Sequence, residues 1–351
     1  MLKGCLDLGC EIETNARIVE LTTDSIDGRV TGLFSDKFGK RTRFVAKRSV
    51  VVASGGFEWN AELLAEHFPN GAMFLGSPSS NEGDGQRLMA AAGAKLDRMD
   101  QANIYASLPT YYEGRLQALP VGFQAEKHAI VIDRSGKRFV SEYDFNIGEA
   151  LDRRDPVTNE PLHLPAWVIG DCRFLRHASV FRWYARKSSG WLVQAKSLRE
   201  LSRRLQLPEE AVTKTVQRYN QFCLKGRDVD FHRGESAWEK FKVGGAEALG
   251  AIEQPPFFAV PFNRSILGTK GGARTNARGQ VLRPDGSVIA GLHAAGLAMA
   301  NPIGTRAVGP GTTIGPNLTW GFICAESILK DNFARTNDRT SHDRRSGCLR
   351  W

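Results

Sequence analysis

The first fifty residues alternate between apolar and polar positions in the way that short, half-buried β-strands do. Gly9 follows a helical pattern and is suited to end it, and Asp27-Gly28 is a turn signal between two alternating runs. The pattern therefore predicts a helix followed by antiparallel strands. In chain order these are a helix over 2–8 and strands over 11–14, 17–21, 29–33 and 43–46.

A different pattern follows at residues 49–53, where Ser-Val-Val-Val-Ala is apolar without alternation and is closed by Ser54-Gly55-Gly56. A continuous β-branched run of this kind is typical of a strand that is buried on both faces in a parallel sheet. The stretch 81–85 then gives a turn and a helix entry. The following helix has an apolar face made of Leu88, Met89, Ala92 and Leu96. Parallel strand and helix together predict an α/β fold.

A second region begins near Asp100 and contains most of the aromatic residues. It includes a helix predicted over 208–224 and is punctuated at its end by Pro255-Pro256 and Pro261. The C-terminal third is rich in glycine and closes with a helix predicted over 317–329. Residues 336–351 are polar and basic without periodicity, so a disordered tail is expected there.

Composition narrows the function classes. A chain of 351 residues predicts two domains, and its net charge of +9 is too scattered to favour nucleic-acid binding. The six cysteines show no CxxC pair and the seven histidines no metal-ligand spacing, so neither a disulfide framework nor a metal site is expected. Apolar runs fall far short of the roughly 20 residues of a membrane helix. A cytoplasmic protein is the resulting expectation.

Three glycine-rich stretches are the candidate ligand sites, at 54–56, 268–272 and 309–316. The third runs directly into a helix, whose first-turn N–H groups have no partner inside the helix and can face an anion or an electron-rich ring. The alternative is that these glycines only permit tight turns. Because neither a GxGxxG between strand and helix nor a P-loop is present, a kinase or NTPase is excluded.

The motifs taken together, in this order, resemble the flavoprotein subunits of fumarate reductases and, more closely, the 3-ketosteroid dehydrogenase-like branch of FAD-dependent oxidoreductases. The resemblance extends from Leu2 to about Leu329. The segments that carry it are Val51–Phe57, Glu82–Gly85 with Ala91–Ala94, Asp133–Glu142, Asp230–Glu235, Gly268–Gly272, and Ile289–Gly296 leading to Gly309–Gly321.

The resemblance implies an incomplete Rossmann-like FAD-binding domain with an inserted α+β capping domain that forms much of the substrate pocket. The FAD-binding domain would comprise 1–99 and 265–335, the cap 100–264, and the tail 336–351. Family members begin with a strand–GxGxxG–helix that cradles the FAD pyrophosphate, and this chain starts after it. The expectation is weak binding of FAD by the chain alone, with a second chain as the partner that would supply the missing half.

Site residues follow from the resemblance by position. Ile18 would pack on the adenine of FAD, Ser54 and Gly55 would approach the adenosine half, and Ala295 and Gly296 would lie under the ribityl-pyrophosphate. At the pyrimidine edge of the isoalloxazine the implied residues are Thr313, Ile314 and Leu318. A helix N-terminus there would favour the negative charge of the reduced flavin.

For catalysis, ketosteroid dehydrogenases carry a Tyr shortly after their RFxNE stretch, which implies Tyr143 as the base; the alternative is a Tyr that only packs at a domain interface. Their ketone-polarising Tyr corresponds here to Ala307. Arg306 beside it matches the Arg with which fumarate reductases hold a carboxylate. Gly309 would donate its backbone N–H to the substrate carbonyl.

The expected function is FAD-dependent oxidation or reduction of a CH–CH bond next to a carbonyl, with a small-molecule substrate. A bulky cyclic or steroid-like ketone is favoured because the cap is rich in aromatic residues. Two alternatives stay open. One is a fumarate- or succinate-type enzyme of carboxylates held by Arg306, and the other is a catalytically silent partial flavin fold that acts as a binding module.

Overall fold

The structure is a computed structural model that describes residues 1–68, 74–112, 114–120, 125–178, 191–243, 245–304, 306–307, 309 and 311–345. Its helices are α1 (Leu2–Asp7), α2 (Ala61–His67), α3 (Asp84–Ala91), α4 (Ile147–Asp152), α5 (Cys172–His177), α7 (Leu198–Arg204), α8 (Glu209–Lys225), α9 (Ala237–Val243) and α10 (Ile314–Arg345), with 3₁₀ turns η1 (Gly245–Ala248) and η2 (Gly296–Ala298).

The strands within the described residues form five sheets. The first contains β1 (Arg17–Thr23), β2 (Val30–Lys37) and β3 (Lys40–Val45), and the second β15 (Gln280–Leu282), β16 (Val288–Ala294) and β4 (Val50–Val52). The next two are β14 (Gly272–Ala273) with β6 (Leu96–Asp97), and β5 (Phe74–Leu75), β13 (Asn263–Thr269), β7 (Ala102–Tyr112) and β8 (Arg115–Pro120). The fifth is β11 (Val193–Ala195), β12 (Phe257–Pro261), β10 (Ala166–Gly170) and β9 (Ala129–Asp133).

The N- and C-terminal segments share one core. β4 and β16 are parallel neighbours, and Val52, Met89 and Leu292 pack between this sheet and α3. β1, β2 and β3 form an antiparallel meander beside it, as the alternation predicts. Helix α1 ends at Asp7, two residues before Gly9, whose φ of 79° turns the chain so that the Gly9 N–H donates to Leu6 O and the Cys10 N–H to Cys5 O.

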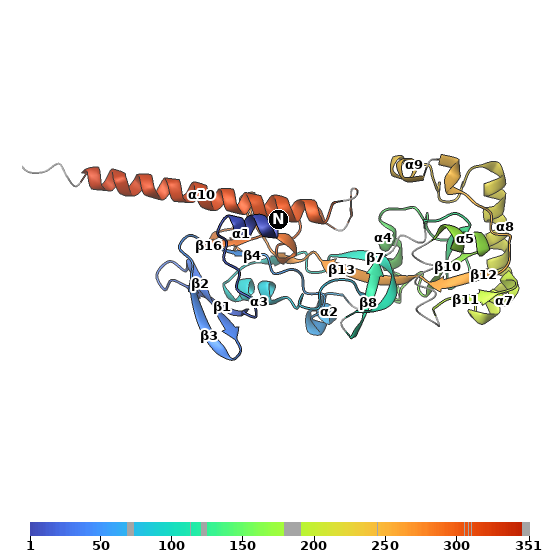
Figure 1. Ribbon diagram of the computed structural model, residues 1–351, viewed down its shortest axis with the longest axis horizontal. Coiled ribbons are helices and arrows are strands. Elements are labelled where there is room, and N and C mark those ends of the chain that lie inside the picture. Colours follow the sequence, from blue (N-terminus) through green and yellow to red (C-terminus); the bar gives the residue numbers. More distant parts are fainter. Residues whose placement is uncertain are drawn as a thin grey trace, which may run out of the picture.

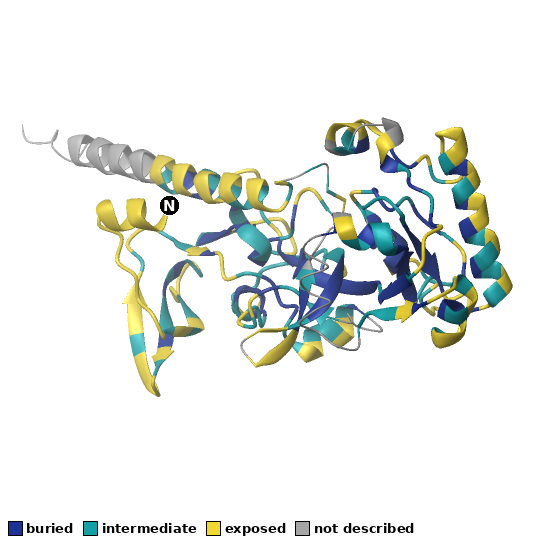
Figure 2. Cartoon of the chain, turned by 45° about the vertical axis from the view of Figure 1, so that its right-hand side comes forward, coloured by how far each residue is buried: buried dark blue, intermediate teal, exposed yellow. Residues whose placement is uncertain are grey.

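The middle of the chain, predicted to be the cap and called so below, lies at the end of the molecule away from β1–β3 (Figure 1). Its sheet β11-β12-β10-β9 has a core on each face. On one side α8 contributes Val212, Val216 and Tyr219, spaced by four and three residues as the inward face of a helix requires. Figure 2 shows the buried residues concentrated in this sheet and its neighbour, whereas α1 and much of β1–β3 are exposed.

The two halves are joined through a shared sheet. The chain leaves the first half along β7 and returns along β13, and these strands are antiparallel neighbours from Asn263 opposite Ser107 to Thr269 opposite Ala102. β13 also follows β12 of the cap sheet with only Phe262 between them. The predicted boundaries near residues 100 and 264 therefore fall within one four-stranded sheet rather than in a flexible linker.

Three local predictions differ from the structure. Residues 11–14 form no strand, because Asn15 has a φ of 57° and the run finds no partner among the described residues. β4 is not buried on both faces, since Val51 is 42% exposed and β4 lies at the edge of its described sheet. Leu96 belongs to β6 and not to the preceding helix, which ends at Ala91 before the positive φ of Gly93.

The C-terminal helix also exceeds its predicted length. α10 begins at Ile314 and continues to Arg345, whereas the pattern predicted an end near 329 and a disordered tail over 336–351. The prediction is wrong for 336–345, because no Gly or Pro interrupts the sequence between Gly321 and Gly347. Residues 346–351 lie outside the described residues.

Candidate active site

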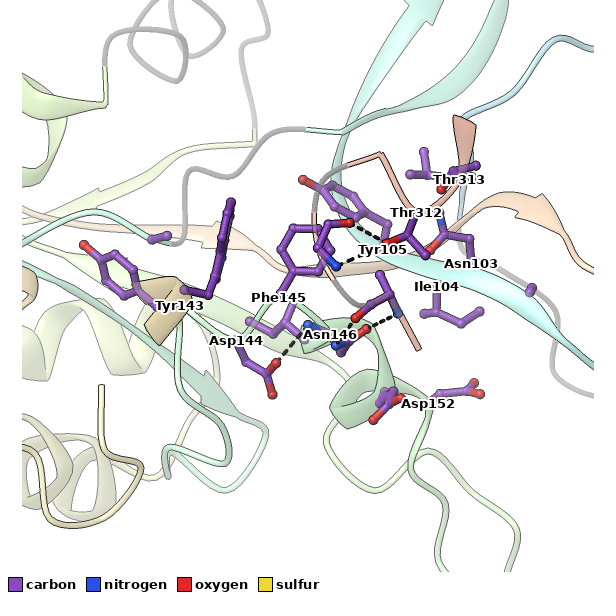
Figure 3. A pocket seen from close by; sticks show the side chains of 18 of the residues that line it. Asn103, Ile104, Tyr105, Tyr143, Asp144, Phe145, Asn146, Asp152, Thr312 and Thr313 are labelled. Atoms are coloured by element: carbon purple, nitrogen blue, oxygen red, sulfur yellow. Dashed lines mark hydrogen bonds between the residues drawn. The ribbon is translucent and has the colours of Figure 1, made fainter. Parts of the chain in front are cut away.

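A cavity of about 570 Å³ lies where the cap meets the glycine-rich loop before α10 (Figure 3). Its walls come from β7, from the segment that follows the turn after β9, from α4, and from the start of α10. Figure 3 shows Tyr143 at one end, Thr312 and Thr313 at the other, and Asn146 between them. Two of the three expected catalytic residues, Tyr143 and Gly309, line this cavity together with the expected flavin residues Thr313 and Ile314.

Tyr143 is held in place by a buried ionic network. The adjacent Glu142 accepts hydrogen bonds from Arg138 Nε at 2.9 Å and from Arg233 Nη1 at 3.1 Å, and Arg138 also donates to Asp228 at 2.8 Å. The side chains of Glu142, Asp228 and Arg233 are fully buried. Two positive and two negative groups therefore compensate one another, as burial requires.

Burial sets the protonation of Tyr143, and the network opposes its effect. Burial raises the pKa of its phenol above the ordinary value, and the Arg233 guanidinium, with Cζ 4.8 Å from the ring centroid, opposes this only in part. The phenol is consequently protonated near neutral pH. In this form it can donate a hydrogen bond or a proton to a substrate, whereas accepting a proton would require prior ionisation.

The backbone of Gly309 is engaged within its own turn. Its N–H contacts Thr312 Oγ1 at 3.2 Å, and the same hydroxyl donates to Gly309 O at 2.6 Å. A substrate carbonyl can receive the Gly309 N–H only if the Thr312 side chain turns away. Thr312 itself faces the cavity, so its hydroxyl is a second candidate donor at this end.

Arg306 does not lie in the cavity wall. Its side chain is 67% exposed and its Nη1 is 3.4 Å from Glu149 Oε2 on α4. Glu149, by contrast, lines the cavity. The charge that the sequence assigned to a substrate carboxylate is thus compensated by a carboxylate of the protein.

The expected cofactor residues lie at the ends of two parallel strands. Ser54 and Gly55 follow β4, Ala295 and Gly296 follow β16, and Ala295 N–H bonds Val52 O at 3.0 Å. The carboxyl ends of parallel strands are where α/β sheets bind ligands. Ile18 lies apart, on β1, and is half-buried. The structure thus gathers four of these residues at one sheet edge.

Open space surrounds the glycines of this region. A Cβ built at Gly296, Gly309, Gly311 or Gly315 would meet no atom of the described residues within 4 Å. The N-terminus of α10 opens onto the same region, with Ile314 and Leu318 65% and 50% exposed. This is a cradle that a flat, electron-rich group can fill, and it fits the isoalloxazine expected at Thr313, Ile314 and Leu318.

Sequence reasoning missed two cavity residues. Tyr105 on β7 places a second phenol in the wall, and burial raises its pKa. Its signal was present, because 102–112 is a long strand in which Asn103 and Tyr105 share a face. Asn146 gave no signal, since its role depends on a loop that lies 161 residues later in the chain.

Comparison with known proteins identifies the class. The model of the FAD binding domain family matches residues 1–314, and the chain belongs to this family, within the superfamily of fumarate reductase and 3-ketosteroid dehydrogenase flavoproteins.

Two curated relatives and one solved structure illustrate the relationship. The chain is 33% identical to a 3-oxosteroid 1-dehydrogenase of Mycobacterium tuberculosis over 93% of this chain and 61% of the relative. It is 33% identical to a 4-oxocyclohexanecarboxylate 2-dehydrogenase of Sinomonas cyclohexanicum over 86% and 54% of the two chains. The crystal structure of the 3-ketosteroid delta1-dehydrogenase of Sterolibacterium denitrificans superimposes with a TM-score of 0.84 at 24% identity, covering 93% of this chain and 61% of that one.

The chain therefore spans roughly three fifths of the length of these proteins, 61% of the first relative. The similarity to the solved structure supports the fold. Within the described residues, no helix is both long and apolar enough to cross a membrane.

Proposed function

We propose that this protein is the cap and distal flavin-binding part of an FAD-dependent dehydrogenase that oxidises a CH–CH bond next to the carbonyl of a cyclic ketone. The observation that carries the proposal is the cavity that brings a protonated tyrosine, Tyr143, together with the glycine-rich N-terminus of α10. Two relatives whose names specify cyclic ketones support the same substrate class.

FAD would lie along Gly296 and the loop before α10, where the open glycines Gly296, Gly309 and Gly311 leave room for it among the described residues. When bound, it would supply the acceptor for a hydride from the substrate. The positive end of the α10 helix dipole would favour negative charge there, and the exposed Ile314 offers an apolar contact for a ring.

The other wall of the cavity binds the substrate. Phe145 and Trp238 stack edge to face with ring centroids 5.2 Å apart, and with Ile104 and Leu267 they give the cavity apolar surface that suits a carbocyclic ring. Oxidation releases a proton as well as a hydride, and Tyr143 would take up that proton only as the phenolate, after its own proton has left. Burial raises the pKa of this phenol, so the phenolate is disfavoured near neutral pH.

A ketone is favoured over a dicarboxylate by the charges in the wall. Among the described lining residues, the carboxylates of Glu142, Glu149 and Asp152 are paired with arginines. The other charged side chains in the wall are the two carboxylates Asp100 and Asp144 and one arginine, Arg153. With no excess of positive charge, the cavity offers a neutral carbonyl donor groups but gives a dicarboxylate little compensation for its lost hydration.

Stable FAD binding would require a complementary nucleotide-binding segment, on a longer form of this chain or on a second chain. Among the described residues β4 has a strand neighbour on one side only, and this edge together with the exposed Val51 would provide a surface on which that segment could pack.

The test is to co-express the chain with the nucleotide-binding segment of a relative and to measure flavin content and turnover. Substrates are a 3-ketosteroid, 4-oxocyclohexanecarboxylate and fumarate. We expect bound FAD and oxidation of a cyclic ketone, with a loss of about 100-fold or more in kcat for Tyr143→Phe. Tyr111→Phe is the control, because Tyr111 is 79% exposed on β7.

Reduction of fumarate alone, with Tyr143→Phe fully active, would overturn the proposed substrate and the role of Tyr143. A complex that binds FAD but turns over none of these substrates would favour the silent module instead.

A further inference from the structure

The cap and the glycine-rich loop are joined by a pair of hydrogen bonds between one side chain and one backbone position. Asn146 Nδ2 donates to Ala307 O at 3.0 Å, and Ala307 N–H donates to Asn146 Oδ1 at 2.7 Å. Both polar groups of the Ala307 backbone are thereby satisfied by a residue of the cap (Figure 3). The two bonds fix the loop in distance and in rotation, which a single bond cannot do.

Asn146 is itself held on a rigid support. It is the N-cap residue of α4, and its own N–H bonds Asp144 Oδ1 at 2.8 Å. α4 buries Ile147 and Leu151 in the cap core. At Gly148 the helix approaches β7 so closely that an added Cβ would lie 2.1 Å from Ile104 O. The helix therefore has no room to shift toward β7.

A second contact lies one turn further along α4. Glu149, three residues after Asn146, faces Arg306 at 3.4 Å. Two successive loop positions are therefore held by two residues on one face of the helix. Because Arg306 is largely exposed, this ion pair is the weaker member, and the amide pair of Asn146 is the stronger.

We propose that Asn146 is a positioning residue that latches the loop at Arg306 and Ala307 to the cap, so that Gly309 and the start of α10 keep a fixed distance from Tyr143. The inference rests on the proposed function. It predicts that the two ends of the cavity are aligned by Asn146 and drift apart when its amide is removed. A shift of about 1 Å between reacting groups is enough to cost two orders of magnitude in rate.

The chain contains a matched control for this side chain. Asn220 on α8 makes the same pair of bonds with Ile252: Asn220 Nδ2 donates to Ile252 O at 3.0 Å, and the Ile252 N–H donates to Asn220 Oδ1 at 2.8 Å. This pair lies within the cap and outside the cavity wall. Asn220→Ala therefore removes the same two bonds as Asn146→Ala. Only their location relative to the loop differs.

The first measurement is hydrogen exchange of backbone amides in the full chain, followed by NMR. Asn146→Ala should speed exchange at Ala307 by about tenfold or more and leave Ile252 unchanged, whereas Asn220→Ala should do the reverse. This readout needs neither flavin nor substrate. In the flavin-loaded complex, Asn146→Ala should also lower kcat by about tenfold or more with unchanged flavin content, and Asn220→Ala should not lower it.

Unchanged exchange at Ala307 in Asn146→Ala would overturn the latch, and so would an equal loss of kcat in Asn220→Ala. If Asn146→Ala does not fold, Asn146→Asp decides, because it keeps the acceptor of the Ala307 N–H. Faster exchange at Ala307 with a lowered kcat would support the latch, because one of the two bonds is lost, and wild-type exchange with wild-type kcat would overturn it. A wild-type complex without turnover would instead count against the proposed function, while the exchange result would still stand.

Discussion

Replacing Glu142 by Gln is the sharpest test of how the cap supports the site. The Glu142 carboxylate is fully buried and accepts bonds from Arg138 Nε and Nη2, from Arg233 Nη1 and from Val131 N at 2.8 to 3.1 Å. Gln keeps the shape but removes the charge and one acceptor. Arg138 and Arg233 are then left with the single carboxylate of Asp228.

The cost follows from this arrangement. Breaking a buried ion pair by removing one partner destabilises a protein by about 3 to 5 kcal/mol. With a urea m-value of about 2 kcal/mol/M, the unfolding midpoint should fall by roughly 1.5 to 2.5 M. Glu210→Gln is the control, because Glu210 forms an exposed i,i+4 pair with Lys214, and its midpoint should stay within error of the wild type.

The pH dependence adds an independent check. Burial alone would raise the pKa of Glu142, but the two arginines and the hydrogen bonds outweigh it and lower the pKa below its ordinary value of 4.5. A lowered pKa stabilises the fold above pH 4.5 and loses this contribution as pH falls toward the folded-state pKa. The difference in urea unfolding midpoint between wild type and Glu142→Gln should therefore become smaller as the pH falls below 4.5. A midpoint difference for Glu142→Gln that is no larger than that for Glu210→Gln, or that does not change with pH, would refute the reasoning.

Three other expectations concern single positions. Because burial raises the pKa of Tyr143 above 10.0, its tyrosinate absorbance should appear only beyond that pH; a signal below it that Tyr143→Phe removes would contradict this. Gly296 has a φ of 69°, so Gly296→Val should cost about 1 to 2 kcal/mol in backbone strain and abolish FAD uptake, measured by flavin absorbance. Gly286→Val is the control: at a φ of 85° it should cost a similar strain and leave FAD uptake intact. Met89→Ala empties a fully buried site and should lower the free energy of unfolding by about 2 to 5 kcal/mol in urea, against no measurable change for the 76% exposed Leu224→Ala.

Local features of the fold were predictable where the sequence pattern depends on neighbours in the chain. The alternation at β1 and β2 and the helical spacing of α8 are of this kind. The burial of β4 was not, because it depends on which strand lies beside it. The pattern of Val50–Val52 is the same whether a sheet edge is covered or free.

The candidate site, too, has features that could be predicted from the sequence and features that could not. The resemblance directed attention to Tyr143, Gly309, Thr313 and Ile314, and the structure brings them to one cavity. It could not show that Arg306 pairs with Glu149, because this contact links residues 157 positions apart. The resemblance also rests on two separate motifs, at 133–142 and 230–235. In the structure both belong to one salt-bridge network, because Arg233 of the second motif donates to Glu142 of the first. Motifs that are far apart in sequence can record a contact in space.

The adjacency of β7 and β13 has a consequence for protein engineering. Both passages between the halves lie next to each other in one sheet, with Ser107 and Ser265 in contact across it. A foreign cap could therefore be spliced in at two cut points that are already neighbours, without bridging any gap. Such an exchange needs to preserve only the strand register between 102–107 and 263–269. Exchanging the cap at this junction would be a way to change the substrate preference while the predicted flavin-binding part stays the same.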